Sequence, residues 1–110
     1  MFSPPSPLYI ACGPNMIVGI LTVRLRLPEN QSLKGKRQVV KSVIQRVRNR
    51  FNVSVAEVED QDLWQLATIG VGCVSNSTSH VNETLSRVMD FIVRSRPDAE
   101  LLDYEIEILP

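Results

Sequence analysis

The hydrophobic period of this chain changes from two to the helical value and back, and this change restricts its fold more than any other feature. From Met16 to Leu27 apolar residues occupy every second position, as in a strand with one buried face. Leu21 and Val23 lie on the buried face of such a strand, and Arg24 and Arg26 lie on the other. Residues 16–27 are therefore predicted to form a one-sided strand.

Five further segments show one or the other of these two periods. They are a helix over residues 33–50, strands over residues 53–59 and 64–74, a helix that starts after Ser79 and ends before Pro97, and a strand over residues 100–109. Elements in the order β-α-β-β-α-β, each with a single apolar face, are typical of the ferredoxin-like fold. We therefore predict an α+β domain with a four-stranded antiparallel sheet and two helices on one face.

The length of 110 residues and the hydrophobic content of 44% suit one globular domain, which we assign to residues 16–110. Residues 1–15 are rich in proline and carry no charge, so we expect a disordered leader or an extension from a misassigned start. The apolar run from Leu8 to Cys12 is too short for a signal sequence or a membrane span. Cys12 and Cys73 are too few for a disulfide framework, so we expect a reduced, cytoplasmic protein.

Charge is segregated along the sequence although the formal net charge is zero. Seven of the twelve Lys and Arg residues fall between Lys34 and Arg50, and no Asp or Glu lies among them. The rest of the chain holds five basic and twelve acidic residues. The predicted first helix is thus a cation on an acidic body, a distribution that points to a polyanionic partner.

The basic residues of this helix form a row. At about 100° per residue, Lys34, Arg37, Lys41, Gln45 and Arg48 fall within an arc of about 80°, so nucleic-acid phosphates could bind along it. The predicted polyanion-binding residues are Ser32, Lys34, Lys36, Arg37, Lys41, Arg46, Arg48 and Arg50. The alternative is an ordinary solvated helix face, since Lys and Arg are good helix formers. The absence of carboxylates three or four positions away argues against that alternative, because such pairs stabilise a helix.

Four short segments also resemble those of a known family. In chain order they are Met16-Ile17-Val18-Gly19, Ser32-Leu33-Lys34-Gly35-Lys36-Arg37, Asn52-Val53-Ser54-Val55-Ala56-Glu57-Val58 and Asp62-Leu63-Trp64-Gln65. Through them the chain is similar to the YlxP-like family of small uncharacterised bacterial proteins. The resemblance implies a ferredoxin-like domain, a cytoplasmic location and a connection with translation or ribosome maturation, and no established activity. The chain departs from the family at Gly35, where an acidic residue is usual, and at Leu66, where a basic one is usual.

The sheet face away from the helices is a second candidate surface. If the last strand lies beside the first, Asp103, Glu105 and Glu107 face Arg24 and Arg26. The same face lacks the aromatic side chains with which an RNA-recognition motif stacks bases, so we expect a protein partner there, in the simplest case a homodimer. The residues assigned to this partner or dimer surface are Val18, Ile20, Gly70, Gly72 and Trp64. For the tryptophan, packing over an edge of the core is the alternative.

Catalytic and metal-binding patterns have little support in the sequence. His80 is the single histidine, and no nucleophile accompanies it in the sequence. Asp60 and Asp62 lie in one turn without the further oxygen ligands that a calcium or magnesium site needs. We therefore predict neither a catalytic residue, nor a cofactor, nor a metal.

A phosphohydrolase is the least favoured alternative. Acylphosphatases share the predicted topology and hold phosphate with an arginine and an asparagine, a role that Arg37 could fill with Asn30 or Asn52. Glu29 in the same loop would repel phosphate. The sequence thus predicts a non-enzymatic cytoplasmic module that binds RNA or a ribonucleoprotein through its first helix or, alternatively, a protein through its sheet.

Overall fold

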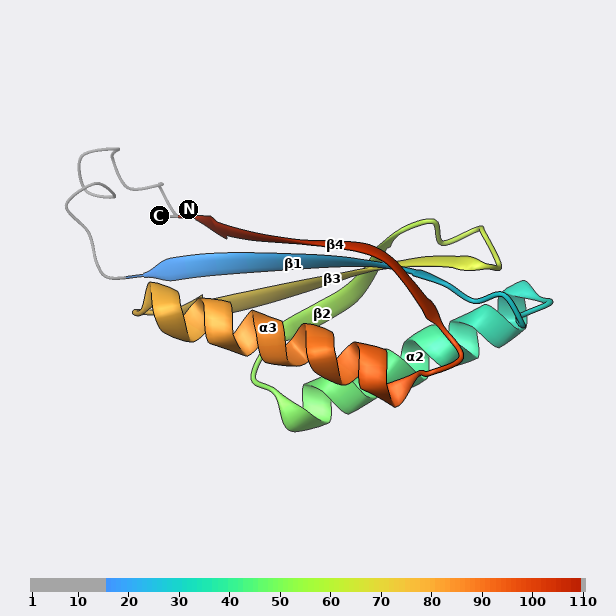
Figure 1. Cartoon of the computed structure of the whole chain (residues 1–110), viewed down its shortest axis with the longest axis horizontal. Helices are drawn as coiled ribbons and strands as arrows, with labels where there is room; N and C mark the ends of the chain where they lie inside the picture. The colour runs from blue at the N-terminus through green and yellow to red at the C-terminus, as the bar shows by residue number, and fades with distance from the viewer. Residues whose placement is uncertain (1–15, 110) are drawn as a thin grey trace, which may run out of the picture.

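Figure 1 shows the fold in a computed structural model that describes residues 16–109. Its elements are β1 (Ile17–Arg26), α2 (Leu33–Arg50), β2 (Ser54–Glu59), β3 (Leu66–Ser75), α3 (Thr78–Ser95) and β4 (Glu100–Leu109). The order of elements is the predicted one, and the bounds of α2 and β4 equal the predicted ranges. The leader that we expected over residues 1–15 lies outside the described residues.

The four strands form one antiparallel sheet in the order β2-β3-β1-β4. Both helices lie on one face of it, with α3 against β1, β3 and β4 and with α2 against β2 and α3 (Figure 1). This arrangement is the ferredoxin-like α+β fold that the sequence predicts. Within residues 16–109 no element covers the opposite face, which we call the open face.

The core lies between the sheet and the two helices and is almost entirely aliphatic. The two central strands bury every second residue and each helix buries one stripe, so the predicted apolar faces of these four elements are confirmed. In β4, Leu102 and Tyr104 of the predicted apolar face are exposed. Buried side chains include Leu21, Val23 and Leu25 of β1, Ile69 and Val71 of β3, Val40, Val43 and Val47 of α2, and Val81, Leu85, Val88 and Ile92 of α3. Gly19 lets α3 approach β1 closely, because a Cβ atom there would lie 2.2 Å from Cγ1 of Val81.

Both helices begin at a serine cap. The Oγ atom of Ser32 accepts a hydrogen bond from the backbone N–H of Gly35 (2.9 Å), and that of Ser77 accepts one from the N–H of His80 (3.3 Å). Each bond satisfies a backbone amide that the first turn of a helix leaves without a carbonyl partner. The cap at Ser32 therefore determines the residue at which α2 begins.

The hairpin between β2 and β3 differs from the prediction at three strand ends, one of which is the end of β3 at Ser75 rather than at Val74. The structure begins β2 at Ser54 rather than at Val53, and β3 at Leu66 rather than at Trp64. The side chain of Asn30 donates a hydrogen bond to the main-chain carbonyl of Trp64, which makes no ladder contact with a neighbouring strand. Trp64 thus belongs to the connection that precedes β3.

Two ion pairs join β1 and β4 on the open face. Of the three acidic residues predicted to face Arg24 and Arg26, only Asp103 forms one of them. Arg24 Nη1 lies 3.0 Å from Asp103 Oδ1, and this hydrogen bond, together with the charge of Asp103, raises the pKa of Arg24. A shift of register after Arg24 then places Glu100 beside Arg26, at 3.9 Å. The other two acidic residues of β4 lie opposite uncharged residues of β1.

Candidate nucleic-acid interface

One side of α2 carries a row of exposed cations, Lys34, Arg37, Lys41 and Arg48, which we call the cationic stripe. Arg46 is exposed on another flank of the same helix. Within residues 16–109 none of these five side chains forms an ion pair. Their positive charge is therefore available to a ligand, and the helix holds it in a fixed row.

Lys36 does not belong to this surface, and the prediction that placed it there is wrong. Its side chain is fully buried, its Nζ lies 2.8 Å from Oε2 of Glu57, and it donates a hydrogen bond to the main-chain carbonyl of Asp60. The cause is its position one helical turn before Val40, which places it on the buried stripe that Val43 continues. That spacing is the signal in the sequence that could have revealed it.

Three more of the predicted residues have partners within the chain. Arg48 Nη2 donates to the carbonyl of Val55 (3.2 Å), and the guanidinium of Arg50 lies 5.2 Å from the ring centroid of Phe91. Both arginines are exposed, and neither of these contacts supplies a compensating negative charge. The hydroxyl of Ser32 already accepts the capping bond of α2, so its part is to fix the start of the helix.

The basic residues outside α2 behave differently, because each of the five forms an ion pair. The pairs are Arg24–Asp103, Arg26–Glu100, Arg87–Glu83, Arg94–Asp90 and Arg96–Asp98. In α2 only the buried Lys36 has an acidic partner among the described residues. Cations without a carboxylate partner are thus confined to one helix in residues 16–109.

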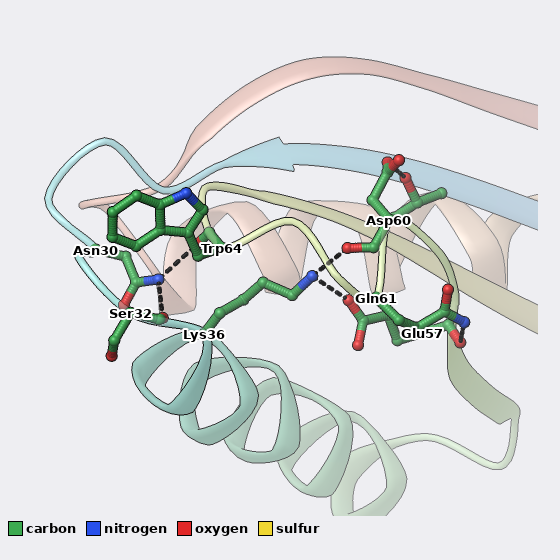
Figure 2. Close-up of polar contacts among 8 residues, drawn as sticks. Asn30, Ser32, Lys36, Glu57, Asp60, Gln61 and Trp64 are labelled. Carbon is green, nitrogen blue, oxygen red and sulfur yellow. Dashed lines mark hydrogen bonds and ion pairs between the residues drawn. The ribbon is translucent and has the colours of Figure 1, made fainter.

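A polar network fixes the first turns of α2 to the turn after β2 (Figure 2). Asp60, whose backbone has a φ of +62°, accepts from Lys36 through its carbonyl and from buried Thr68 through its carboxylate (2.8 Å). The side chain of Gln61 donates to the carbonyl of Glu57 (3.4 Å). Asp60 therefore has structural partners, and no group of three potential metal ligands occurs in residues 16–109.

Asn30 forms the second half of this connection. Its side-chain amide donates to the main-chain carbonyls of Ser32 (2.7 Å) and Trp64, and its main-chain carbonyl accepts from the side chain of Gln65 (3.4 Å). A Cβ atom on Gly35 would lie 2.5 Å from Oδ1 of Asn30, so glycine makes room for this amide. The sequence held no local signal for the contact with Trp64, because Asn30 and Trp64 are 34 residues apart.

The residues of the predicted partner surface do not form one patch. Val18 lies opposite Val74 at one end of the β1–β3 pair, and Trp64 precedes Leu66 at the other end. The eight residue steps from Leu66 to Val74 span about 26 Å at about 3.3 Å per residue. Ile20 and Gly72 share the end with Val18 (a Cβ at Gly72 would have no neighbour within 4 Å). The backbone at Gly70 is covered by the side chain of Val58, because a Cβ atom there would lie 2.8 Å from Cγ1 of Val58.

The structure places the two asparagines of the phosphohydrolase alternative at opposite ends of α2. Asn30 uses its amide in the contacts described above, and Asn52 follows the C-terminal end of α2, whereas Arg37 lies near its start. The backbone N–H of His80 is bonded to the cap of α3, and Cys73 is buried in the core.

A hollow of about 720 Å³ lies between the C-terminal half of α2 and α3. Its lining residues are Arg50, Phe51, Arg87, Asp90, Phe91, Arg94 and Ser95. A smaller groove of about 340 Å³ runs between the cationic stripe and β2 and is lined in part by Lys41 and Arg48.

Comparison with known proteins places the chain in a family. Its residues 18–106 match the family described as "Protein of unknown function (DUF503)". The chain belongs to this family. It is also 46% identical over 61 residues to "Uncharacterized protein YlxP" of Bacillus subtilis (strain 168), an alignment that covers 56% of this chain and 66% of that protein. The resemblance to the YlxP-like family is thereby confirmed.

A solved structure supports the fold alone. The "De novo designed protein Foldit4" matches 86% of this chain and 97% of its own length with a TM-score of 0.52 and a sequence identity of 13%. None of the helices in residues 16–109 has the length and apolar composition that a membrane crossing requires.

Proposed function

We propose that this member of the DUF503 family is a non-enzymatic, cytoplasmic module that binds RNA, alone or within a ribonucleoprotein, through the cationic stripe of α2. The single observation that carries this proposal is the uneven pairing of charge. All five basic residues outside α2 have a carboxylate partner, and the four of the stripe have none among residues 16–109.

Physical chemistry favours a polyanion as the ligand of such a row. Like charges on one helix repel one another, and an intrachain carboxylate at the right spacing would relieve that repulsion. Phosphates along a nucleic-acid backbone relieve it as well and release their counterions on binding. A row of side chains on a straight helix contacts successive phosphates without reading bases, so the stripe supplies affinity and orientation rather than sequence specificity.

The test is a titration of fluorescently labelled single-stranded RNA followed by anisotropy over a series of salt concentrations. The variant replaces Lys34, Arg37 and Lys41 together by glutamine, which keeps good helix propensity. If each contacts one phosphate, the slope of log affinity against log salt decreases in magnitude by about 2, since each contact with single-stranded RNA contributes about 0.7.

A matched control removes the same amount of charge elsewhere. Arg26, Arg87 and Arg94 are exposed and paired with carboxylates, and their joint replacement by glutamine should leave the affinity and the slope near those of the parent protein. Equal losses in both triple variants would mean that only overall charge matters. A parent protein that binds no RNA at low salt would reject the proposed function.

A protein-binding role of the open face is the second candidate, and one observation favours it. Val74 is 63% exposed, Val58 49% and Ile20 37%, which leaves apolar side chains on a sheet face that lacks cover within residues 16–109. Exposed apolar patches of this kind mark contacts with other chains. A homodimer through this face is compatible with RNA binding on α2, because the two surfaces lie on different sides of the fold.

A further inference from the structure

Trp64 is an exposed aromatic ring on an immobilised stretch of backbone. Its side chain is 49% exposed, although tryptophan has more apolar surface to bury than any other residue. Its carbonyl accepts the hydrogen bond of Asn30, and the next carbonyl, that of Gln65, accepts one from the N–H of Leu27 (2.8 Å). A contact made by this indole would therefore cost little conformational entropy.

The ring lies at the N-terminal end of the cationic stripe. The amide of Asn30 bonds the carbonyls of both Trp64 and Ser32, and Ser32 directly precedes α2, so the tryptophan lies beside the first turn of that helix (Figure 2). Lys34 is in this first turn and is exposed, and Arg37 follows one turn later. An aromatic face and a row of cations thus adjoin at one end of the fold.

We propose that Trp64 stacks on a base of single-stranded RNA whose phosphates lie along the cationic stripe. This inference rests on the proposed function and adds the class of nucleic acid to it. A single strand presents its bases to an aromatic ring, whereas the bases of an A-form duplex are stacked on one another and out of reach.

The charges near the ring agree with a base rather than a phosphate at Trp64. Asp62 lies two residues before it and Glu29 directly precedes Asn30, and both carboxylates are exposed. They repel phosphate from the loop, while Lys34 and Arg37 attract it to the helix. A strand that places its backbone on α2 and one base on the indole satisfies both conditions.

Trp64 is the single tryptophan of the chain, so its intrinsic fluorescence reports directly on stacking. We would titrate the full chain with a short oligouridylate and, as a probe with phosphates and no bases, with inorganic polyphosphate. We expect the oligouridylate to quench the fluorescence, and polyphosphate to compete for the same surface without quenching. Quenching of equal size by both probes would overturn the inference.

The matched variants are Trp64→Ala and Trp64→Phe, with retention of the fold checked by circular dichroism. We expect the alanine variant to bind labelled oligouridylate about 10-fold to 100-fold more weakly with an unchanged salt slope and an unchanged affinity for polyphosphate. The phenylalanine variant should retain most of the affinity, because it keeps an aromatic face.

The failure of this inference and that of the proposed function give different results. Salt-dependent binding of oligouridylate with unchanged fluorescence and with no loss in Trp64→Ala would refute stacking and leave the stripe intact as an RNA site. If that variant instead loses self-association and no RNA affinity, Trp64 belongs to a protein contact and the inference is likewise refuted. Absence of binding by the parent protein would reject both proposals together.

Discussion

Replacing Glu57 by glutamine should destabilise the fold more than any other single loss of a charged side chain that the structure describes. The carboxylate lies 2.8 Å from the ammonium of Lys36, whose side chain is 0% exposed, whereas that of Glu57 is 15% exposed. After the change, the buried cation retains only neutral acceptors, including the carbonyl of Asp60. Removal of one partner of a buried ion pair costs about 3–5 kcal/mol, and the partial exposure of Glu57 favours the lower end, about 3 kcal/mol.

The reverse change should cost less. Lys36→Met keeps an unbranched side chain on the buried stripe with Val40 and Val43, and the remaining carboxylate of Glu57 can reach water. The Oε2 atom of Glu57 lies within ion-pair distance of Lys36, but it is buried and accepts no hydrogen bond within residues 16–109. The cost of burying this oxygen therefore offsets part of its attraction to the lysine. We therefore expect a loss of about 1 kcal/mol for Lys36→Met and nearly the same for the double variant, a coupling of about 3 kcal/mol between the two sites.

Urea unfolding followed by circular dichroism measures these free energies. For a domain of this size, a loss of about 3 kcal/mol lowers the melting temperature by about 10–20 °C, so Glu57→Gln should also be distinguished in a thermal scan. Additive effects of the two changes, or a stability of Glu57→Gln within 1 kcal/mol of the parent protein, would refute the assignment of a buried, coupled pair.

Two glycines give further predictions. Gly19→Ala should lower the free energy of unfolding by about 1–3 kcal/mol, because the added carbon would lie 2.2 Å from Val81 and 2.8 Å from Leu85, whereas Gly72→Ala, which meets nothing within 4 Å, is the control. Gly72→Arg should fold normally but abolish self-association through the open face in sedimentation velocity. A variant that stays dimeric, or a parent that is monomeric, would exclude that face as a dimer interface.

Local periodicity was sufficient to predict the fold. The bounds of α2 and β4 and the buried face of β1 follow from spacing alone, because α2 and β1 each bury one face and β4 alternates apolar with acidic residues. The start of β3 was misplaced because Trp64 extends the apolar run, while a side chain 34 residues away holds its backbone outside the sheet. Contacts over such separations have no signature within a window of a few residues.

The site was predictable in its charge and not in its geometry. A count of Lys and Arg identifies the helix but does not distinguish a cation directed toward the core from those directed toward solvent. Lys36 is separated from the stripe only by its place in the helical repeat, one turn before Val40. The same repeat that hides this lysine turns its neighbours Lys34 and Arg37 outward.

The buried pair of Lys36 and Glu57 and the exposed cations of the stripe lie on the same helix, so the packing of the pair bears on the proposed binding surface. The buried stripe of α2, which holds Lys36 against Glu57 together with Val40 and Val43, turns the exposed cations outward, and Asn30 fixes the position of the first turn beside Trp64. A helix fixed in this way holds its cations at constant spacing. The conformational entropy of aligning them is therefore lost when the chain folds and not when it binds phosphates. Lys36→Met with Glu57→Gln should then retain the RNA affinity of the parent protein, since it preserves the packing and touches no exposed cation. Loss of affinity without loss of stability would show instead that the buried pair contributes to binding.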